Sequence, residues 1–443
     1  MDFTPHTSND VARMLGAIGL DDVDGLFAHL PAGVRVAGAL GLPPPRSEME
    51  VMARIDELGR RTAGDLICFA GGGIYDHHLP PVVRSLTLRP EFVTSYTPYQ
   101  AEVAQGVLQA LFEYQSMVAA ITGLPVANAS LYDGATAALE AVNLAVAATR
   151  RSAVWVSRGL NPRTREVIAT FASARDVEVV EHPIVGGRTA WAPDAGPEPA
   201  ALLYGQPNYL GVVEEHDTAV SIAHDAGALA IAEFDPMLTG VLRRAGDAGC
   251  DVAFAEGQPL GSPMSFGGPV LGMFATSTEH LRRIPGRLVG RTTDRQGRPA
   301  YTLTLRTREQ DIRREKASSN ICTNQTLNAV GAAVHLAWLG PDGLAEVGRQ
   351  SVAKAHHLAR RLGQIKGVTI PVEGFAREFP VLLPADPDAV VLALAEHGYL
   401  AGIPLATDYP DLPGGLLVAV TEKRSRSELD GFAAALEEVL SDA

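Results

Sequence analysis

The sequence ALAIAEFD, residues 228–235, opens with Ala228–Ile231, one of several short apolar runs in the middle of the chain. Each run has about the length of a buried strand, and helical patterns such as 163–174 and 217–226 lie between them. Strands that alternate with helices are typical of a mainly parallel sheet with both faces covered. We therefore predict an α/β fold. The other apolar runs are Ala153–Val156, Val177–Val180, Ala201–Tyr204 and Val252–Ala255.

The segments on either side of these runs suggest a division into three parts. Residues 1–90 alternate short helical patterns with loops and predict an N-terminal helical arm. Residues 91–325 form the large α/β domain, which opens with an amphipathic helix over 102–123. Residues 326–443 predict a small α+β domain that begins with a long helical stretch, 327–339 and 341–362. Further predicted elements are helices 136–148, 389–397 and 427–440 and strands 381–383 and 416–420.

The composition indicates a globular protein and disfavours binding to nucleic acid or anionic membranes. Of 443 residues, 46% are hydrophobic and 20% are charged, which suits a large buried core and argues against disorder. The formal net charge of −14 disfavours nucleic acid and anionic membranes as partners, because both require a concentrated basic face.

The cysteines and the N-terminus indicate a compartment. Cys68, Cys250 and Cys322 lie far apart without a CxxC pair, so we expect neither a disulfide framework nor a structural zinc site. Residues 1–19 lack the pattern of a signal peptide, and we find no apolar run of membrane-spanning length. We expect a cytoplasmic protein.

Several ordered motifs carry a family resemblance that runs from about residue 10 to the C-terminus. The motifs are Thr97-Pro98-Tyr99-Gln100, Phe69-Ala70-Gly71-Gly72-Gly73-Ile74-Tyr75-Asp76-His77, Gln206-Pro207-Asn208-Tyr209-Leu210-Gly211, Glu256-Gly257-Gln258, Ser265-Phe266-Gly267-Gly268-Pro269 and residues 313–325, RREKASSNICTNQ. With these motifs the chain resembles the glycine decarboxylase P-protein of the glycine cleavage system, specifically the N-terminal half that many bacteria make as a separate subunit 1.

The resemblance implies both a fold and a reaction. The fold would be that of the fold-type-I enzymes that depend on pyridoxal phosphate (PLP), like aspartate aminotransferase. The activity would be that of glycine dehydrogenase (aminomethyl-transferring): PLP serves as electron sink when CO2 leaves glycine, and the aminomethyl group passes to the lipoyl arm of the H-protein. The family further implies a partner, glycine dehydrogenase subunit 2, in a two-plus-two heterotetramer.

The chain lacks the lysine that such a reaction needs. Enzymes of this fold pair an Asp at a strand end with the pyridine nitrogen of PLP and carry the PLP-binding lysine one strand later. Asp235 takes the first place, but the second reads Glu256-Gly257-Gln258, and Gln258 cannot bind PLP covalently. The four lysines of the chain all lie outside residues 153–276; they are Lys316, Lys354, Lys366 and Lys423.

The expected phosphate site is unsuitable as well. PLP phosphate usually binds at a helix N-terminus, where free N–H groups and the helix dipole favour an anion. Here that place reads Asp133-Gly134-Ala135-Thr136, which differs from the usual Asp-Glu-Gly-Thr of the family. The carboxylate would repel a phosphate, and we interpret Asp133 as a helix cap. PLP should therefore be bound covalently by the partner subunit and not by this chain.

Two segments are candidates for contributing to the partner's active site. Tyr96, Tyr99 and Gln100 lie in a rigid extended turn before a helix and would contribute to the substrate site or interface. The polar run 318–325 resembles the loop that reaches a neighbouring PLP site in fold-type-I dimers. Asn320, Thr323 and Asn324 are the candidate ligands for the partner's PLP phosphate.

Two alternatives compete with this interpretation. The chain could be a structural or regulatory pseudoenzyme subunit without a catalytic contribution. It could also be a self-sufficient PLP enzyme that uses Lys316, although this lysine lies far beyond Asp235 in the sequence. We expect no metal site, because His77 and His78 are sequence neighbours whose side chains point apart.

Overall fold

The computed structural model describes residues 5–36, 38–194 and 196–442. It divides into two compact units, Met1–Gly64 and Asp65–Ala443. No helix in the described part of the chain is both long and apolar enough to span a bilayer. The predicted boundaries at residues 90 and 325 remain predictions.

The first unit consists of short helices with little core. Its α-helices are α1 (Ser8–Ala17) and α2 (Glu48–Arg60). Both begin with a capping box: Thr7 pairs with Asp10, and Ser47 pairs with Glu50. Among the side chains described for this unit, Leu15 is the buried one.

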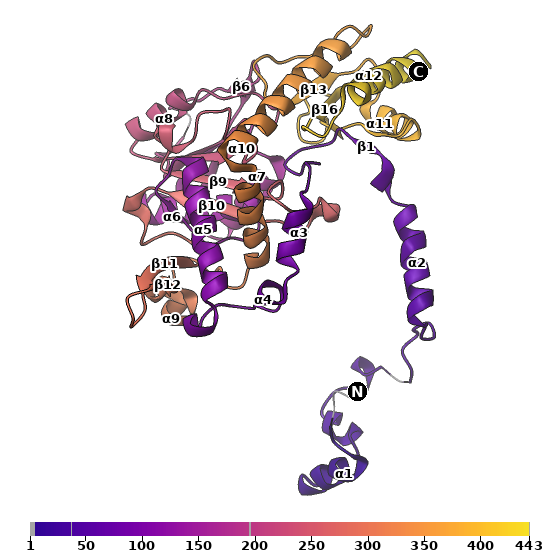
Figure 1. Ribbon diagram of the computed structural model, residues 1–443, viewed down its shortest axis with the longest axis vertical. Helices are drawn as coiled ribbons and strands as arrows, with labels where there is room; N and C mark the ends of the chain where they lie inside the picture. Colours follow the sequence, from indigo (N-terminus) through magenta and orange to yellow (C-terminus); the bar gives the residue numbers. More distant parts are fainter. Residues whose placement is uncertain (1–4, 37, 195, 443) are drawn as a thin grey trace. The chain divides into compact units, whose positions relative to one another are not determined.

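The second unit is built on a seven-stranded sheet with the order β2-β10-β9-β8-β7-β3-β4 (Figure 1). The five strands from β9 to β4 are parallel, and β10 runs antiparallel to both of its neighbours. The predicted mainly parallel sheet is thus confirmed. The strands are β2 (Val126–Ala127), β3 (Ala153–Ser157), β4 (Glu178–His182), β7 (Ala201–Gln206), β8 (Leu229–Phe234), β9 (Val252–Glu256) and β10 (Gly272–Thr276).

Helices cover both faces of this sheet. Side chains alternate between the faces along a strand, so Leu202 packs on one side and Leu203 on the other. The side of Leu202 carries the apolar residues of α5 and the first part of α10, and the side of Leu203 carries those of α6 and α7. The helices of this region are α3 (Pro81–Thr87), α4 (Pro90–Val93), α5 (Gln105–Thr122), α6 (Gly134–Thr149), α7 (Pro162–Ser173), α8 (His216–Asp225), α9 (Gln310–Arg313) and α10 (Thr326–Leu362).

The C-terminal region has its own core. The helix α10 breaks at Gly340, as the sequence predicts, and its second part packs with α12 and a three-stranded sheet. The short strand β1 (Ile67–Cys68) pairs with β14, and the ring of Phe69 stacks on that of Phe432 at 4.3 Å between centroids. The elements are β13 (Glu378–Leu382), α11 (Pro387–Glu396), β14 (Tyr399–Leu400), β15 (Ile403–Pro404), β16 (Gly415–Ala419) and α12 (Arg426–Asp442).

Several strands were not predicted from the sequence. Among them are β2 and β10, which extend the main sheet, and the hairpin of β11 (Leu288–Thr293) and β12 (Pro299–Thr304). A further short hairpin joins β5 (Ile184–Val185) to β6 (Arg188–Thr189).

The helix α11 offers a matched test of the C-terminal core. Leu394 is fully buried, whereas Leu392 is 72% exposed on the same helix. We expect Leu394→Ala to lower the free energy of unfolding by roughly 2–5 kcal/mol, because it leaves a cavity. Leu392→Ala should change it by less than about 0.5 kcal/mol. Urea unfolding of both variants checks this, and equal effects would contradict the packing described.

Candidate functional site

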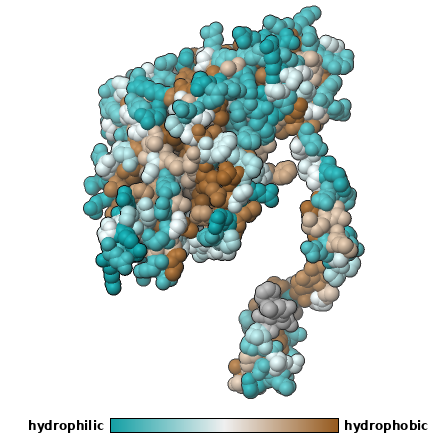
Figure 2. All heavy atoms as spheres, viewed as in Figure 1, coloured by the Kyte–Doolittle hydropathy of each residue, from teal (hydrophilic) through white to brown (hydrophobic). Residues whose placement is uncertain are grey.

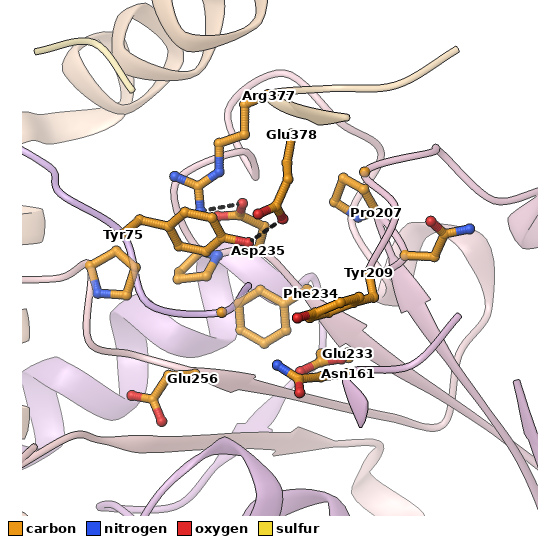
Figure 3. A pocket seen from close by; sticks show the side chains of 15 residues that line it. Tyr75, Asn161, Pro207, Tyr209, Glu233, Phe234, Asp235, Glu256, Arg377 and Glu378 are labelled. Atoms are coloured by element: carbon orange, nitrogen blue, oxygen red, sulfur yellow. Dashed lines mark hydrogen bonds and ion pairs between the residues drawn. The ribbon is translucent and has the colours of Figure 1, made fainter. Parts of the chain in front are cut away.

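A polar cavity of about 70 Å³ lies at the carboxyl ends of the central strands (Figure 3). Ligands of open α/β sheets bind at this edge, so the fold itself points to the place. The loop before α3 and the start of β13 close it from the other side. The labelled residues around it are Tyr75, Asn161, Pro207, Tyr209, Glu233, Phe234, Asp235, Glu256, Arg377 and Glu378.

Gln258 lies just after β9, where the sequence analysis placed the missing lysine. It is 2% exposed, and both ends of its amide are engaged. The Oε1 atom accepts a hydrogen bond from the Tyr75 N–H at 3.0 Å, and Nε2 donates to the Ser262 carbonyl at 2.8 Å. Gln258 therefore holds the loop around Tyr75 against the end of the sheet.

Asp235 lies just after β8 and binds an arginine of the C-terminal region. Its Oδ2 lies 2.6 Å from Nη2 of Arg377, and its Oδ1 accepts from the Met237 N–H at 3.0 Å. The guanidinium carbon of Arg377 also lies 3.6 Å from the centroid of the Tyr75 ring. Figure 3 shows the three side chains gathered at one wall of the cavity.

The polar network continues behind Arg377. The Arg377 side chain contacts the His77 ring, whose Nδ1 lies 2.5 Å from the Glu422 carboxylate. Glu378 accepts hydrogen bonds from the Gly72 N–H at 2.7 Å and from the Tyr75 hydroxyl at 2.8 Å. The loop before α3 is thus fixed to the C-terminal region. In the described part of the chain, no group of acidic, His and Cys side chains forms a metal site.

Two carboxylates occupy the N-terminus of α6. Asp133 accepts from the Thr136 N–H at 2.7 Å, which confirms the predicted cap. Glu256, at the end of β9, accepts from the Gly134 N–H at 3.0 Å. A Cβ atom on Gly134 would come within 2.8 Å of the Glu256 nitrogen, so helix and strand are in close contact here. An anion would meet the carboxylate of Asp133, and the N–H groups of Gly134 and Thr136 are already engaged.

These residues do not fit PLP. The amide of Gln258 is engaged, Asp235 is neutralised by Arg377, and carboxylates hold the helix N-terminus. The cavity of about 70 Å³ is also far below the roughly 300 Å³ at which small-molecule sites begin. This pocket is therefore not assigned a step of PLP chemistry.

The two segments predicted to contribute to the partner's active site contact each other, at a place that is not part of the polar cavity. The Tyr96 hydroxyl lies 2.9 Å from the Thr323 hydroxyl, and Asn324 is hydrogen-bonded to Ser130. Tyr96 is 73% exposed, so this cluster opens to the surface. Tyr96 and Thr323 are brought together although they lie 227 residues apart in the sequence, and Asn324 follows Thr323 directly.

Two arginines that the sequence analysis missed surround Tyr99. Nη2 of Arg287 donates to the Tyr99 hydroxyl at 3.0 Å and lies 3.6 Å from Sγ of Cys322. The guanidinium carbons of Arg287 and Arg306 lie 5.0 Å and 4.9 Å from the centroid of the Tyr99 ring. No local pattern distinguishes these two from the other arginines of this stretch.

The remaining candidates lie apart from these contacts. Gln100 and Asn320 are exposed, and the structure shows no hydrogen bond from either side chain to another described residue. Lys316 is exposed and lines a separate hollow with Arg282, not the polar cavity. This placement gives no support to a self-sufficient enzyme that uses Lys316.

Three carboxyl groups that line the cavity have raised pKa values. Burial raises the pKa values of Glu233, Glu256 and Glu378 to about 7 each. Glu256 and Glu378 each accept two or more hydrogen bonds, whereas no side-chain hydrogen bond of the Glu233 carboxyl is found among the described residues. Glu233 is therefore the most informative of the three to change.

Restoring the lysine should not restore PLP binding to this chain. In Gln258→Lys we expect no PLP trapped on residue 258 by borohydride, because Arg377 still holds Asp235, and Asp133 and Glu256 still occupy the N-terminus of α6. Mass spectrometry of the reduced peptide is the measurement, with the unchanged chain as control. A stoichiometric adduct on residue 258 would show that the pocket fits PLP.

Stability should depend on pH through Glu233. Its pKa is raised from 4.5 to about 7 by folding, so its stabilising effect is present below about pH 4.5 and is lost as the pH rises through 7. We expect the melting temperature of Glu233→Gln to fall less between pH 5 and pH 8 than that of the unchanged chain. Glu396→Gln, an exposed site, is the control. Parallel curves for all three proteins would refute this assignment.

Comparisons with known proteins identify the family of this chain. The family model of the glycine cleavage system P-protein matches residues 1–436. A relative from Moorella thermoacetica is 45% identical over the full length of both chains, and one from Prosthecochloris aestuarii is 46% identical over 98% of each. Both are named probable glycine dehydrogenase (decarboxylating) subunit 1.

Solved structures give the same result. The crystal structure of a glycine decarboxylase (P-protein) of the glycine cleavage system, in inhibitor-bound form, is 43% identical and superposes with a TM-score of 0.91 over 99% of this chain and 100% of that one. A sphingosine-1-phosphate lyase from Burkholderia pseudomallei, 14% identical, superposes with a TM-score of 0.67 over 92% of this chain and 93% of its own, which shows the fold alone. The predicted fold-type-I architecture is confirmed, and the chain belongs to the glycine cleavage system P-protein family as a relative of its subunit 1.

Proposed function

We propose that this chain is the non-lysine subunit of a two-chain glycine decarboxylase. The complex with subunit 2 decarboxylates glycine through PLP, releases CO2 and transfers the aminomethyl group to the lipoyl arm of the H-protein. PLP is bound covalently by subunit 2. The complex contains two copies of each subunit, as the family resemblance implies. It is located in the cytoplasm.

The observation that carries the proposal is the blocked pocket. A chain with a fold-type-I architecture keeps Asp235 at the end of β8 but pairs it with Arg377, and it holds Gln258 where a lysine would be needed. This arrangement supports the proposal that the PLP site of the decarboxylase is supplied by another subunit.

The cluster around Tyr96 and Thr323 is the proposed contribution of this chain. The hydroxyls of Tyr96 and Thr323 contact each other at an exposed surface, and Arg287 orients Tyr99 beside them. Hydroxyl, amide and backbone N–H donors in such a place suit an anionic group on the neighbouring subunit. Thr323, Asn320 and Asn324 would donate to the PLP phosphate of the partner, and Tyr96, Tyr99 and Gln100 would line the substrate side.

The two-chain character is testable by exchange of labelled CO2 with glycine in the presence of lipoylated H-protein. We expect exchange from the mixture of the two subunits and none from either subunit alone. Full activity of subunit 2 by itself would reduce this chain to an accessory.

The role of the polar run is testable by substitution. Each hydrogen bond to a phosphate contributes roughly 1.5–3 kcal/mol, so Thr323→Ala or Asn320→Ala should weaken PLP retention by about one to two orders of magnitude. Titration of PLP into the cofactor-free complex measures this, after sedimentation shows that the complex still forms. Thr407→Ala, an exposed threonine, is the control. If both variants bind PLP and turn over glycine normally, the structural-subunit alternative replaces the cross-interface role.

A further inference from the structure

The stretch 282–316 carries a charge opposite to that of the whole protein. It contains eleven Lys and Arg residues and four Asp and Glu residues, a formal charge of +7 in a chain whose total is −14. We name this stretch the basic lobe. Such a separation of charge within one acidic chain indicates a surface for an acidic partner.

The basic lobe packs against the main core through Val289 and Leu303. It consists of the β11–β12 hairpin, α9 and the connecting turns, next to one end of α5 (Figure 1). Figure 2 shows a hydrophilic surface over this corner. In the described part of the chain, Arg298 and Arg306 are the two basic residues of the lobe that form ion pairs, with Asp294 and Asp311. The exposed basic residues without one are Arg282, Arg283, Arg291, Arg295, Arg313, Arg314 and Lys316.

A hollow of about 360 Å³ concentrates part of this charge. Four basic side chains line it, and no carboxylate is among the lining residues. At its wall, Nε and Nη2 of Arg308 have no hydrogen-bond partner among the described residues. An acidic side chain inserted here would meet several cations at once. The lining residues are Arg282, Leu305, Thr307, Arg308, Arg313, Lys316 and Ser318.

The base of the basic lobe is the cluster around Tyr99. Arg287 precedes β11, Arg306 follows β12, and both guanidinium groups face the Tyr99 ring. The lobe therefore borders the surface at which we place the contribution of this chain to the active site. A molecule bound on the lobe would lie beside that site.

We propose that the basic lobe is the docking surface for an acidic face of the carrier protein that bears the lipoyl arm. This inference rests on the proposed function. The carrier must arrive and leave in every turnover, and complementary charges speed association without a large apolar interface. A permanent subunit contact would instead bury apolar surface, and the exposed side chains of the lobe are predominantly charged. The overall negative charge of the chain argues against nucleic acid.

The test uses the complete complex and two exposed arginines that lie outside the proposed catalytic cluster. In the double variant Arg291→Glu, Arg295→Glu, we expect the KM for lipoylated H-protein to rise roughly tenfold at low salt, since charge at the rim of an interface controls association. The dependence of this KM on salt should become weaker. Both kcat and the exchange supported by free lipoamide should stay within about twofold. Arg360→Glu, an exposed arginine on α10, is the matched control.

Each other outcome contradicts the proposal. If the double variant behaves like Arg360→Glu, the basic lobe does not bind the carrier. If sedimentation shows that the subunits separate, the lobe contacts subunit 2. If the unchanged complex binds a labelled oligonucleotide through these arginines, the partner is a nucleic acid. If the proposed function itself is wrong, the unchanged complex will not exchange CO2 with glycine even when free lipoamide is supplied. This result differs from each of the outcomes above.

Discussion

The buried ion pair between Asp235 and Arg377 determines what the central pocket can do. It joins the end of β8 to the start of β13, with the Tyr75 ring against the guanidinium group. Both side chains are largely withdrawn from water, so removing one partner alone would leave a buried charge at a cost of about 3–5 kcal/mol. A carboxylate held in this way is not free to pair with a cofactor.

Other residues of the pocket are likewise engaged in contacts within the chain. Gln258 binds the loop of Tyr75, and Glu256 caps α6, so the positions that would hold a lysine-bound cofactor and its phosphate now connect parts of the chain. The same fold also positions two surface features. These are the polar cluster of Tyr96 with Thr323 and the Arg-rich hairpin beside it.

The sequence predicts local features well and distant pairings poorly. The apolar run 228–231 predicts β8, which extends from Leu229 to Phe234, and Asp133 is recognisable as a cap because its carboxylate accepts a hydrogen bond within its own turn. Antiparallel β10 is not predicted, because the glycine-rich loop before it, GSPMSFGGP at residues 261–269, gives no clear boundary for a strand. The partnership of Asp235 with Arg377 could not be predicted either, since it depends on how β13 meets the main sheet.

The most direct test of the account locates the cofactor in the working complex. The complex is reduced with borohydride in the presence of PLP, the two subunits are separated, and each is digested and examined by mass spectrometry. We predict that PLP is attached to a lysine of subunit 2 and that none is attached to this chain. PLP found in stoichiometric amount on Lys316, or on any other lysine of this chain, would contradict the account.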